Sequence, residues 1–258
     1  MFDCAKSSKC ECAPCRTTED GTHPASCDGV LKWIKDMLTL RSAKPGTASQ
    51  RRRAIAHYER RGDRYGSNDR GVGLGDRFWN RWFRPREMQV VMETIDAQPG
   101  DEILDVGCGP GAYARQLASR GLHVVATDAS RAMVELTRPL VAQALVSDIE
   151  TLNLGRKFDR VICLGVLDFV ADPGWCIANL AAHVEDGGRL VLLVPRRGLA
   201  GLHYRVAKFF MGVRVNAFDL QSLDRVVCEH GLVLETWRYP LANSIVARWR
   251  KTELVANR

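Results

Sequence analysis

Apolar and polar residues alternate in blocks along the chain from residue 98 onward. Apolar runs of strand length recur there, and segments whose apolar residues have helical spacing separate them. Such an alternation is typical of an α/β fold, a parallel sheet with helices on both faces. The pattern predicts strands near 102–106, 122–127, 143–147, 158–164, 188–194, 231–237 and 242–249, and helices near 111–120, 130–138, 174–184 and 218–230.

Only a few residues, with Tyr239, Pro240 and Leu241 among them, separate the last two predicted strands. A crossover between parallel neighbours needs a dozen or more residues. We therefore expect these two strands to form an antiparallel hairpin.

The first 50 residues are predicted to be a Cys-rich N-terminal tail, a short amphipathic helix and a linker. Within residues 30–40, the apolar residues Val30, Trp33, Ile34 and Met37 share one helical face. Docking of this face onto the chain's own domain is the first interpretation. Weak adsorption to a membrane surface is the alternative.

Residues 51–97 are predicted to be an Arg-rich helical cap, broken at the glycine-rich stretch 62–75. A second segment, residues 196–217, lies between the fifth predicted strand and the next helix. Loops at the carboxyl edge of a sheet are where substrates are commonly held. We expect this segment and the cap to face each other over the active site, and residues 98–252 to form the main domain.

The composition fits a globular protein rather than a membrane protein or a fibre. The chain has 258 residues, of which 46% are hydrophobic, which is ordinary for a globular domain. The longest apolar runs fall far short of the ~20 residues that a membrane span needs. The first residues contain no apolar stretch typical of a secretory signal. These features predict a cytoplasmic location.

Positive charge is concentrated in one part of the chain. The formal net charge is +7, and residues 41–90 contain 13 Lys or Arg against five Asp or Glu. One interpretation is a solvated, arginine-rich helical face. Another is a cap that recognises an acidic substrate, because Arg pairs well with carboxylate and phosphate. Nucleic-acid binding is the third.

The nine cysteines fall into two groups. Four are scattered through the domain and are expected to be small buried hydrophobic residues: Cys108, Cys163, Cys176 and Cys228. Five crowd the first 27 residues, and only Cys12 and Cys15 have the C-x2-C spacing common in metal and redox sites. A tail without fixed structure is the first interpretation. A metal site is the alternative, with candidate ligands Cys4, Cys10, Cys12 and Cys15.

The most informative string is Ile-Leu-Asp-Val-Gly-Cys-Gly-Pro-Gly, at residues 103–111. It is an apolar strand that runs directly into a glycine-rich turn and then a predicted helix. Gly107, Gly109 and Gly111 allow a tight turn and a close approach of the backbone to a ligand. A turn of this kind holds a nucleotide-like cofactor at the carboxyl end of the first strand.

The glycines alone also satisfy the dinucleotide pattern G-x-G-x-x-[GA], so the flanking acids decide. Asp105 stands two residues before Gly107. A pyrophosphate would be disfavoured beside this carboxylate, whereas an ammonium group would be favoured. Asp128 ends the second strand, where a carboxylate can accept both hydroxyls of a ribose. These residues favour S-adenosylmethionine over a nicotinamide dinucleotide.

With these motifs in place, the chain resembles the class I S-adenosylmethionine-dependent methyltransferases. The resemblance runs from about residue 54 to about residue 250 and is strongest at 104–111, 127–133, 147–148 and 158–173. Residues 186–195 resemble the family's fifth strand with its Gly-Gly turn, and residues 57–66 resemble the opening of its quinone-type and porphyrin-type members. The resemblance implies a Rossmann-like sheet of seven mostly parallel strands with an antiparallel last strand, plus an N-terminal helical cap.

The resemblance also implies a cofactor site for S-adenosyl-L-methionine and its product S-adenosyl-L-homocysteine. Gly107, Gly109 and Gly111 would hold the methionine and ribose side, with Asp105 near the ammonium group. Asp128 would accept the ribose hydroxyls. The other expected contacts are Tyr58 at the methionine end, Cys108 in the turn, Ala129 and Met133 against the adenine, Asp148 at the adenine amino group with Ile149 beside it, and the carbonyl of Leu164.

The catalytic residues are less well defined by the resemblance. Many relatives carry a His after the acid in the segment that follows strand four, and here Phe169 takes that place. The remaining candidates for a general base are His203, Tyr204 and His57. A carboxylate nucleophile would need no base, whereas a base can assist a phenol or an amine.

The leading hypothesis is a methyltransferase that acts on oxygen or carbon of a small, planar or acidic metabolite. An RNA or protein methyltransferase is the alternative within the enzymes. The absence of an Asn/Asp-Pro-Pro-Tyr string after strand four argues against methylation of nucleic-acid bases at amino groups. A cofactor-binding protein without catalysis, with a metal- or redox-sensing Cys-rich tail, is a further alternative.

Overall fold

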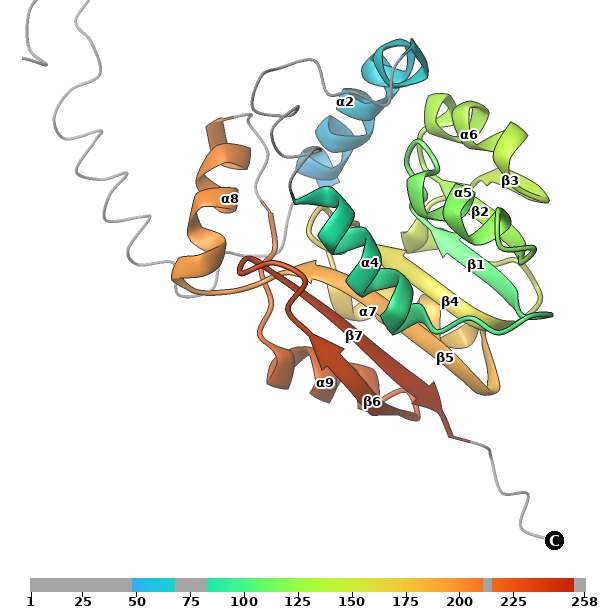
Figure 1. Cartoon of the computed structure of the whole chain (residues 1–258). Coiled ribbons are helices and arrows are strands. Elements are labelled where there is room, and N and C mark those ends of the chain that lie inside the picture. Colours follow the sequence, from blue (N-terminus) through green and yellow to red (C-terminus); the bar gives the residue numbers. More distant parts are fainter. Residues whose placement is uncertain (1–47, 68–82, 211–214, 253–258) are drawn as a thin grey trace, which may run out of the picture. The chain divides into compact units, whose positions relative to one another are not determined.

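A computed structural model describes residues 48–67, 83–210 and 215–252 (Figure 1). The predictions for the Cys-rich tail, the helix at 30–40 and the linker fall outside these residues. The four candidate metal ligands, Cys4, Cys10, Cys12 and Cys15, fall outside them as well.

The described part of the chain is built on a seven-stranded sheet in the order β3-β2-β1-β4-β5-β7-β6. The first five strands in sequence pair parallel to one another, and β7 pairs antiparallel with both β5 and β6. The predicted fold class and the terminal hairpin are therefore confirmed. The strands are β1 (Glu102–Val106), β2 (His123–Asp128), β3 (Gln143–Val146), β4 (Phe158–Leu164), β5 (Val184–Pro195), β6 (Leu232–Arg238) and β7 (Ser244–Lys251).

Alternate strand residues face two separate cores, as the period of two in a strand requires. Ile103 of β1 belongs to the core beneath α4 (Arg84–Ile95) and α5 (Ala112–Ala118). Leu104, the next residue, belongs to the core beneath α7 (Pro173–Ala182) and α9 (Leu220–Cys228). Both faces of the sheet are therefore covered by helices, which explains the continuous apolar runs in its central strands.

Several helices begin at side chains that cap them. Asp172 accepts from the backbone N–H of Trp175 at the start of α7, and Asp219 accepts from that of Ser222 at the start of α9. Ser130 caps α6 (Arg131–Thr137) in the same way. These polar residues fix where each helix starts.

Two helices precede the sheet. Helix α2 (Ala48–Ser67) continues through Gly62 and Gly66, so the expected break in the cap does not begin at Gly62. The helix can tolerate these glycines at a cost of about 1 kcal/mol each relative to alanine. Residues 68–82, with Trp79 and Trp82, lie outside the described part. Helix α4 then lies against β5, β6 and β7.

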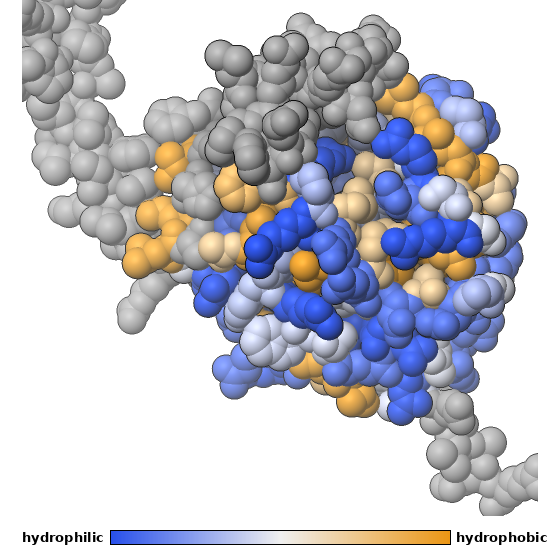
Figure 2. All heavy atoms as spheres, in the orientation of Figure 1, coloured by the Kyte–Doolittle hydropathy of each residue, from blue (hydrophilic) through white to orange (hydrophobic). Residues whose placement is uncertain are grey.

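The segment between β5 and α9 contains a helix, α8 (Leu199–Phe210), where the sequence suggested a loop. Its two ends meet at one point, because Arg196 and Phe218 form an isolated parallel bridge. The N–H of Phe218 donates to the carbonyl of Pro195 at 2.9 Å, and that of Arg197 donates to the carbonyl of Phe218 at 2.7 Å. Figure 2 shows hydrophobic residues over α8, where Leu199 is 89% exposed, and mostly hydrophilic ones over α4.

Three of the four scattered cysteines are buried as predicted: Cys108, Cys163 and Cys176. The prediction for Cys228 is wrong, because this residue is exposed at the end of α9. Its thiol lies 3.4 Å from Oδ1 of Asp224, one turn earlier on the helix. In the described residues, no helix is long and apolar enough to cross a membrane.

Candidate functional site

A cavity of about 460 Å³ opens where β1 and β4 end. The chain passes from β1 outward to β2 and β3 and then returns to β4 on the other side of β1. The carboxyl edge at such a reversal of strand order is where open α/β sheets bind their ligands. Gly107, Gly109 and Leu164 line the cavity from the two strand ends.

The glycine-rich turn is held against the end of β2 by backbone hydrogen bonds. The N–H groups of Gly107 and Cys108 both donate to the carbonyl of Thr127, at 2.7 and 3.0 Å. The φ angles of Gly107, Gly109 and Gly111 are all positive, at 76°, 53° and 80°. Residues with a Cβ rarely adopt this conformation, which explains three alternating glycines.

Asp128 is fixed at the end of β2 by both of its oxygens. Oδ2 accepts from the N–H of Gly109 at 2.9 Å, and Oδ1 accepts from that of Ser130 at 2.8 Å. Burial raises the pKa of Asp128, and these two hydrogen bonds oppose that rise. Because an ionised carboxylate has about four acceptor sites, Asp128 keeps acceptor capacity toward the cavity.

Asp105 lies almost completely buried beneath the turn, at 2% exposure. Its Oδ2 has no hydrogen-bond partner among the described residues. Burial raises the pKa of Asp105 to about 7, and the charge of Asp128 raises it further in the same direction. A buried carboxyl group without a cation is costly, so a cationic ligand in the cavity would stabilise its ionised form.

Helix α2 reaches across one end of the cavity through two charged residues. Arg51 pairs with both Asp148 and Glu150. Two turns later, Glu59 accepts hydrogen bonds from the hydroxyl of Ser130 and from the N–H of Ala132, at the N-terminus of α6. An acidic side chain at this end of a helix is favoured by the helix dipole.

Aromatic side chains line another part of the cavity. Tyr58 and Phe169 meet edge to face, with ring centroids 6.2 Å apart. The hydroxyl of Tyr204 donates to Oδ2 of the buried Asp168 at 2.8 Å. The ammonium group of Lys208 lies 5.4 and 5.5 Å from the ring centroids of Phe169 and Tyr204, within the range of cation–π attraction.

The structure brings most of the predicted cofactor residues to this one cavity. Asp105 lies beneath its surface, and Gly111 begins α5 behind it. Ten of the predicted cofactor residues line the cavity: Tyr58, Gly107, Cys108, Gly109, Asp128, Ala129, Met133, Asp148, Ile149 and Leu164.

The three candidates for a general base are not brought together. Tyr204 lines the cavity. His57 lies on α2, in an edge-to-face contact with Tyr58 at 5.6 Å, and is not among the lining residues. His203 belongs to α8, but its side chain lies outside the described part. No group of three or more His, Cys, Asp or Glu side chains suited to a metal ion occurs in the described residues.

Several site residues were not anticipated from the sequence. Arg51 and Glu59 hold α2 over the cavity, and Asp168 partners Tyr204. Arg51, Ile55, Tyr58 and Glu59 follow one another at helical spacing, and three of them line the cavity. This periodicity was the available signal for the face of α2. Asp168 is the acid of the segment that follows strand four, but nothing in the sequence pointed to its pairing with Tyr204.

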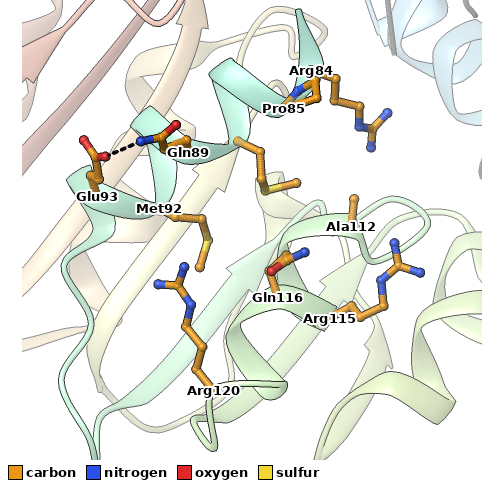
Figure 3. A pocket seen from close by; sticks show the side chains of 10 residues that line it. Arg84, Pro85, Gln89, Met92, Glu93, Ala112, Arg115, Gln116 and Arg120 are labelled. Atoms are coloured by element: carbon orange, nitrogen blue, oxygen red, sulfur yellow. Dashed lines mark hydrogen bonds between the residues drawn. The ribbon is translucent and has the colours of Figure 1, made fainter. Parts of the chain in front are cut away.

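A second hollow, of about 610 Å³, lies between α4 and α5 (Figure 3). Figure 3 shows Arg120, which follows α5, reaching toward Met92 of α4. Arg84 and Ala112 line both hollows, so the two share a wall. This second hollow includes neither the glycines of the turn nor the end of β4. The residues predicted to bind the cofactor line the first cavity and not this one.

Comparison with known proteins identifies the class of protein to which this fold and its glycine-rich turn point. The model of a methyltransferase domain family matches residues 77–239, more than half of the chain. The chain therefore belongs to this methyltransferase domain family. This match confirms the superfamily predicted from the sequence, the S-adenosylmethionine-dependent methyltransferases.

Among individual proteins, the chain is similar to a ubiquinone biosynthesis O-methyltransferase from Rickettsia felis. The two are 32% identical over 123 residues, which cover 44% of this chain and 50% of that protein. The chain spans about half the length of the first curated relatives it matches.

Solved structures show the same fold in enzymes with different reactions. One is magnesium protoporphyrin IX methyltransferase from Synechocystis PCC 6803, solved with bound S-adenosyl-L-homocysteine. The match covers 79% of this chain and 100% of that enzyme, with a TM-score of 0.62 and 18% identity. Another is the N-methyltransferase NodS from Bradyrhizobium japonicum WM9. The match covers 76% of this chain and 99% of that enzyme, with a TM-score of 0.54 and 17% identity. The fold alone therefore does not identify the atom that is methylated.

Proposed function

We propose that this protein is an S-adenosylmethionine-dependent methyltransferase that acts on an oxygen atom of a small molecule with planar or acidic character. One observation carries the proposal: a buried carboxyl group, Asp105, and a half-buried one, Asp128, flank a glycine-rich turn at the point where the strand order reverses. This arrangement favours a cation beside a ribose. A diphosphate at the same turn would meet like charge.

The residues present fit S-adenosylmethionine. Oδ2 of Asp105 is buried and has no partner among the described residues, so a nearby cation would complete its electrostatic environment. At Gly109, an added Cβ would meet nothing within 4 Å, so the turn leaves room against its backbone. Asp128 is already oriented by Gly109 and Ser130 and retains acceptor sites for two hydroxyls.

Other residues would hold the rest of the cofactor. Ala129 and Met133 would pack on the adenine, and Asp148 and Ile149 would lie at its edge. Leu164 would present its carbonyl to the methionine end. Bound there, the cofactor supplies a methyl group on a sulfonium, which is a good leaving group. The main tasks of the chain are then to align the reacting atoms and to exclude water.

The aromatic end of the cavity supports a small planar substrate. Tyr58, Phe169 and Tyr204 line it, and Lys208 adds a positive charge over two of these rings. The similarity to ubiquinone biosynthesis O-methyltransferases supports transfer to oxygen, although it covers only half of those proteins. Arg84, which also lines the cavity, supports recognition of an acidic group.

Isothermal calorimetry with S-adenosyl-L-homocysteine tests the cofactor site. We expect the wild type to bind it and Asp128→Ala to show no detectable binding. Asp186→Ala is the control, because it removes an exposed carboxylate far along the chain, in β5. Equal affinity in the wild type and Asp128→Ala would refute the site.

Transfer of a labelled methyl group to fractionated host metabolites would then identify the substrate class. We expect the label in low-molecular-weight aromatic or acidic fractions. Label that enters only RNA or protein would refute a small-molecule substrate while leaving the cofactor site intact.

A further inference from the structure

A half-buried tyrosine is paired with a buried carboxylate at the aromatic end of the cavity. Oη of Tyr204 donates to Oδ2 of Asp168 at 2.8 Å. Tyr204 lines the cavity, whereas Asp168 is 2% exposed and is not among the lining residues. Asp168 therefore lies behind Tyr204, and this hydrogen bond links it to the cavity. Its other oxygen, Oδ1, has no hydrogen-bond partner among the described residues.

The loop that carries Asp168 is held in place by one residue from beyond α8. The N–H of Asn216 donates to the backbone carbonyl of Asp168 at 2.8 Å. The side-chain amide of Asn216 donates to the carbonyls of Leu167 and Val170, both at 3.0 Å. Three hydrogen bonds thus fix the loop on either side of the acid. A group held in this way loses little freedom when it accepts a proton.

The environment of the pair leaves Asp168 ionised and Tyr204 protonated. Asp168 is therefore the group of the pair that can accept a proton. Burial raises the pKa of Asp168 to about 6, against the hydrogen bond from Tyr204 and the charge of Lys208, which both lower it. Asp168 is thus ionised at neutral pH and is a stronger base than an exposed aspartate. Burial and the nearby Asp168 raise the pKa of Tyr204, so its hydroxyl keeps its proton.

We propose that Tyr204 is a catalytic residue that relays a proton, that Asp168 is the positioning residue behind it, and that the pair adapts the site to a neutral hydroxyl nucleophile such as a phenol. This inference rests on the proposed methyltransferase function. Phe169, which takes the place of the His described in the sequence analysis, has no part in this relay.

The step balances in atoms and in charge. The substrate oxygen forms a bond to the transferred methyl carbon, and the bond from that carbon to sulfur breaks, with the electron pair remaining on sulfur. The substrate hydroxyl proton moves to Oη of Tyr204, while the proton of Tyr204 moves to Oδ2 of Asp168. One positive and one negative charge disappear together, which a dry, low-dielectric cavity favours.

The pair also disfavours a carboxylate as the nucleophile. A carboxylate has no proton to transfer, so the relay would have no role. It would also be brought close to the ionised Asp168, and two like charges in a buried site repel each other. The same geometry therefore selects a hydroxyl over a carboxylate at the position of transfer, whatever acidic group the substrate carries elsewhere.

A titration of the carboxyl group tests the pair without any turnover. The full chain is labelled with aspartate carrying ¹³C at the side-chain carboxyl, and Asp168→Asn identifies the signal of Asp168 by its loss. We expect a midpoint near pH 6 in the wild type. In Tyr204→Phe the midpoint should rise, because the hydrogen bond that lowers the pKa of Asp168 is removed. An Asp168 signal that titrates near pH 4, or that is unchanged in Tyr204→Phe, would overturn the pairing.

Methyl transfer to simple probes tests the role in catalysis, with catechol and benzoate as the matched hydroxyl and carboxylate. We expect transfer to catechol only. Asp168→Asn and Tyr204→Phe should each lower kcat by roughly 100-fold or more, which is the usual size of a general-base contribution. The acid limb of the wild-type pH–rate profile near pH 6 should disappear in Asp168→Asn.

Asn216→Ser is the matched control, because it loosens the same loop while leaving Asp168 and Tyr204 in place. It should keep the acid limb and lose less than 10-fold in kcat. Equal losses in Asn216→Ser and Asp168→Asn, with the limb kept in both, would reduce Asp168 to a structural residue and overturn the relay.

The two proposals fail in different ways. A wild type that does not bind S-adenosyl-L-homocysteine contradicts the methyltransferase function itself. A wild type that binds it and methylates benzoate, or leaves catechol unmethylated, contradicts the hydroxyl nucleophile alone.

Discussion

Gly107 and Val166 meet where β1 and β4 end, so closely that a Cβ on Gly107 would lie 2.2 Å from Cγ2 of Val166. The turn after β1 and the loop after β4 are thus packed against each other at the floor of the cavity. Gly109, two residues further on, has nothing within 4 Å of its corresponding position. The two glycines therefore serve different purposes.

Gly107→Ala should destabilise the fold. The new methyl group would overlap Val166, and overpacking of this kind costs about 1–3 kcal/mol. The left-handed backbone, at φ 76°, adds about 1–2 kcal/mol for any residue with a Cβ. Urea unfolding followed by circular dichroism measures the sum. A free energy of unfolding equal to that of the wild type would show that the turn can move away from β4.

Gly109→Ala should spare the fold and block the cofactor. Only the backbone strain of about 1–2 kcal/mol applies, since the new methyl group enters open space. That space is where we place the cofactor, so binding of S-adenosyl-L-homocysteine should fall by more than 10-fold in calorimetry. Retained affinity would move the cofactor away from this turn.

Binding of S-adenosyl-L-homocysteine should release a proton below pH 7. The pKa of Asp105 is raised to about 7 in the ligand-free protein, and the ammonium group of the ligand would favour the ionised form. Calorimetry at pH 6 in buffers with different ionisation enthalpies measures the released protons. Affinity should rise with pH up to about 7 and then level off. Proton uptake would contradict the placement of the ammonium group.

Stability should depend on Asp105 in the opposite sense. Its folded pKa of about 7 exceeds its ordinary value of 3.8, so the folded state holds a proton that the unfolded chain loses between about pH 4 and 7. The contribution of Asp105 is therefore full below pH 4 and declines as pH rises through this window. Asp105→Asn should remove the decline and melt at a higher temperature than the wild type at pH 8. Parallel melting curves across this pH range would contradict the burial of a charge there.

Arg51→Gln should loosen α2 over the cavity. Arg51 pairs with Asp148 and Glu150, and its loss leaves two partly buried carboxylates without their common partner. We expect faster amide hydrogen exchange in α2 and faster dissociation of S-adenosyl-L-homocysteine. The neighbouring Arg52 is exposed, so Arg52→Gln is the control and should change neither rate. Equal effects of both variants would reduce the role of Arg51 to net charge.

The positions of the strands along the chain and of the glycine-rich turn could be predicted from the sequence because both are local signals. A continuous apolar run and three alternating glycines are each visible within ten residues. The ends of β5 were harder to place, because the strand begins with the polar residues 185–189. These residues continue the ladder through pairs such as Arg160 with Arg189.

The contacts that close the site could not be predicted in the same way. Arg51 and Glu150 are 99 residues apart in sequence, and Tyr204 and Asp168 are 36 apart. No periodicity links such residues, since only the packing of α2 against α6 and of α8 against the loop after β4 brings them together. Tyr204 was considered as a base only because of its residue type. Its partner Asp168 emerged from the structure.

The bridge between Arg196 and Phe218 has a practical consequence for this scaffold. Because the segment from 196 to 218 leaves and rejoins the framework at adjacent points, its interior can be exchanged as a cassette without changing the register of β5 or the start of α9. Grafting the corresponding segment of another enzyme at these two anchor residues would therefore be a direct route to altered substrate range, with the cofactor turn left untouched.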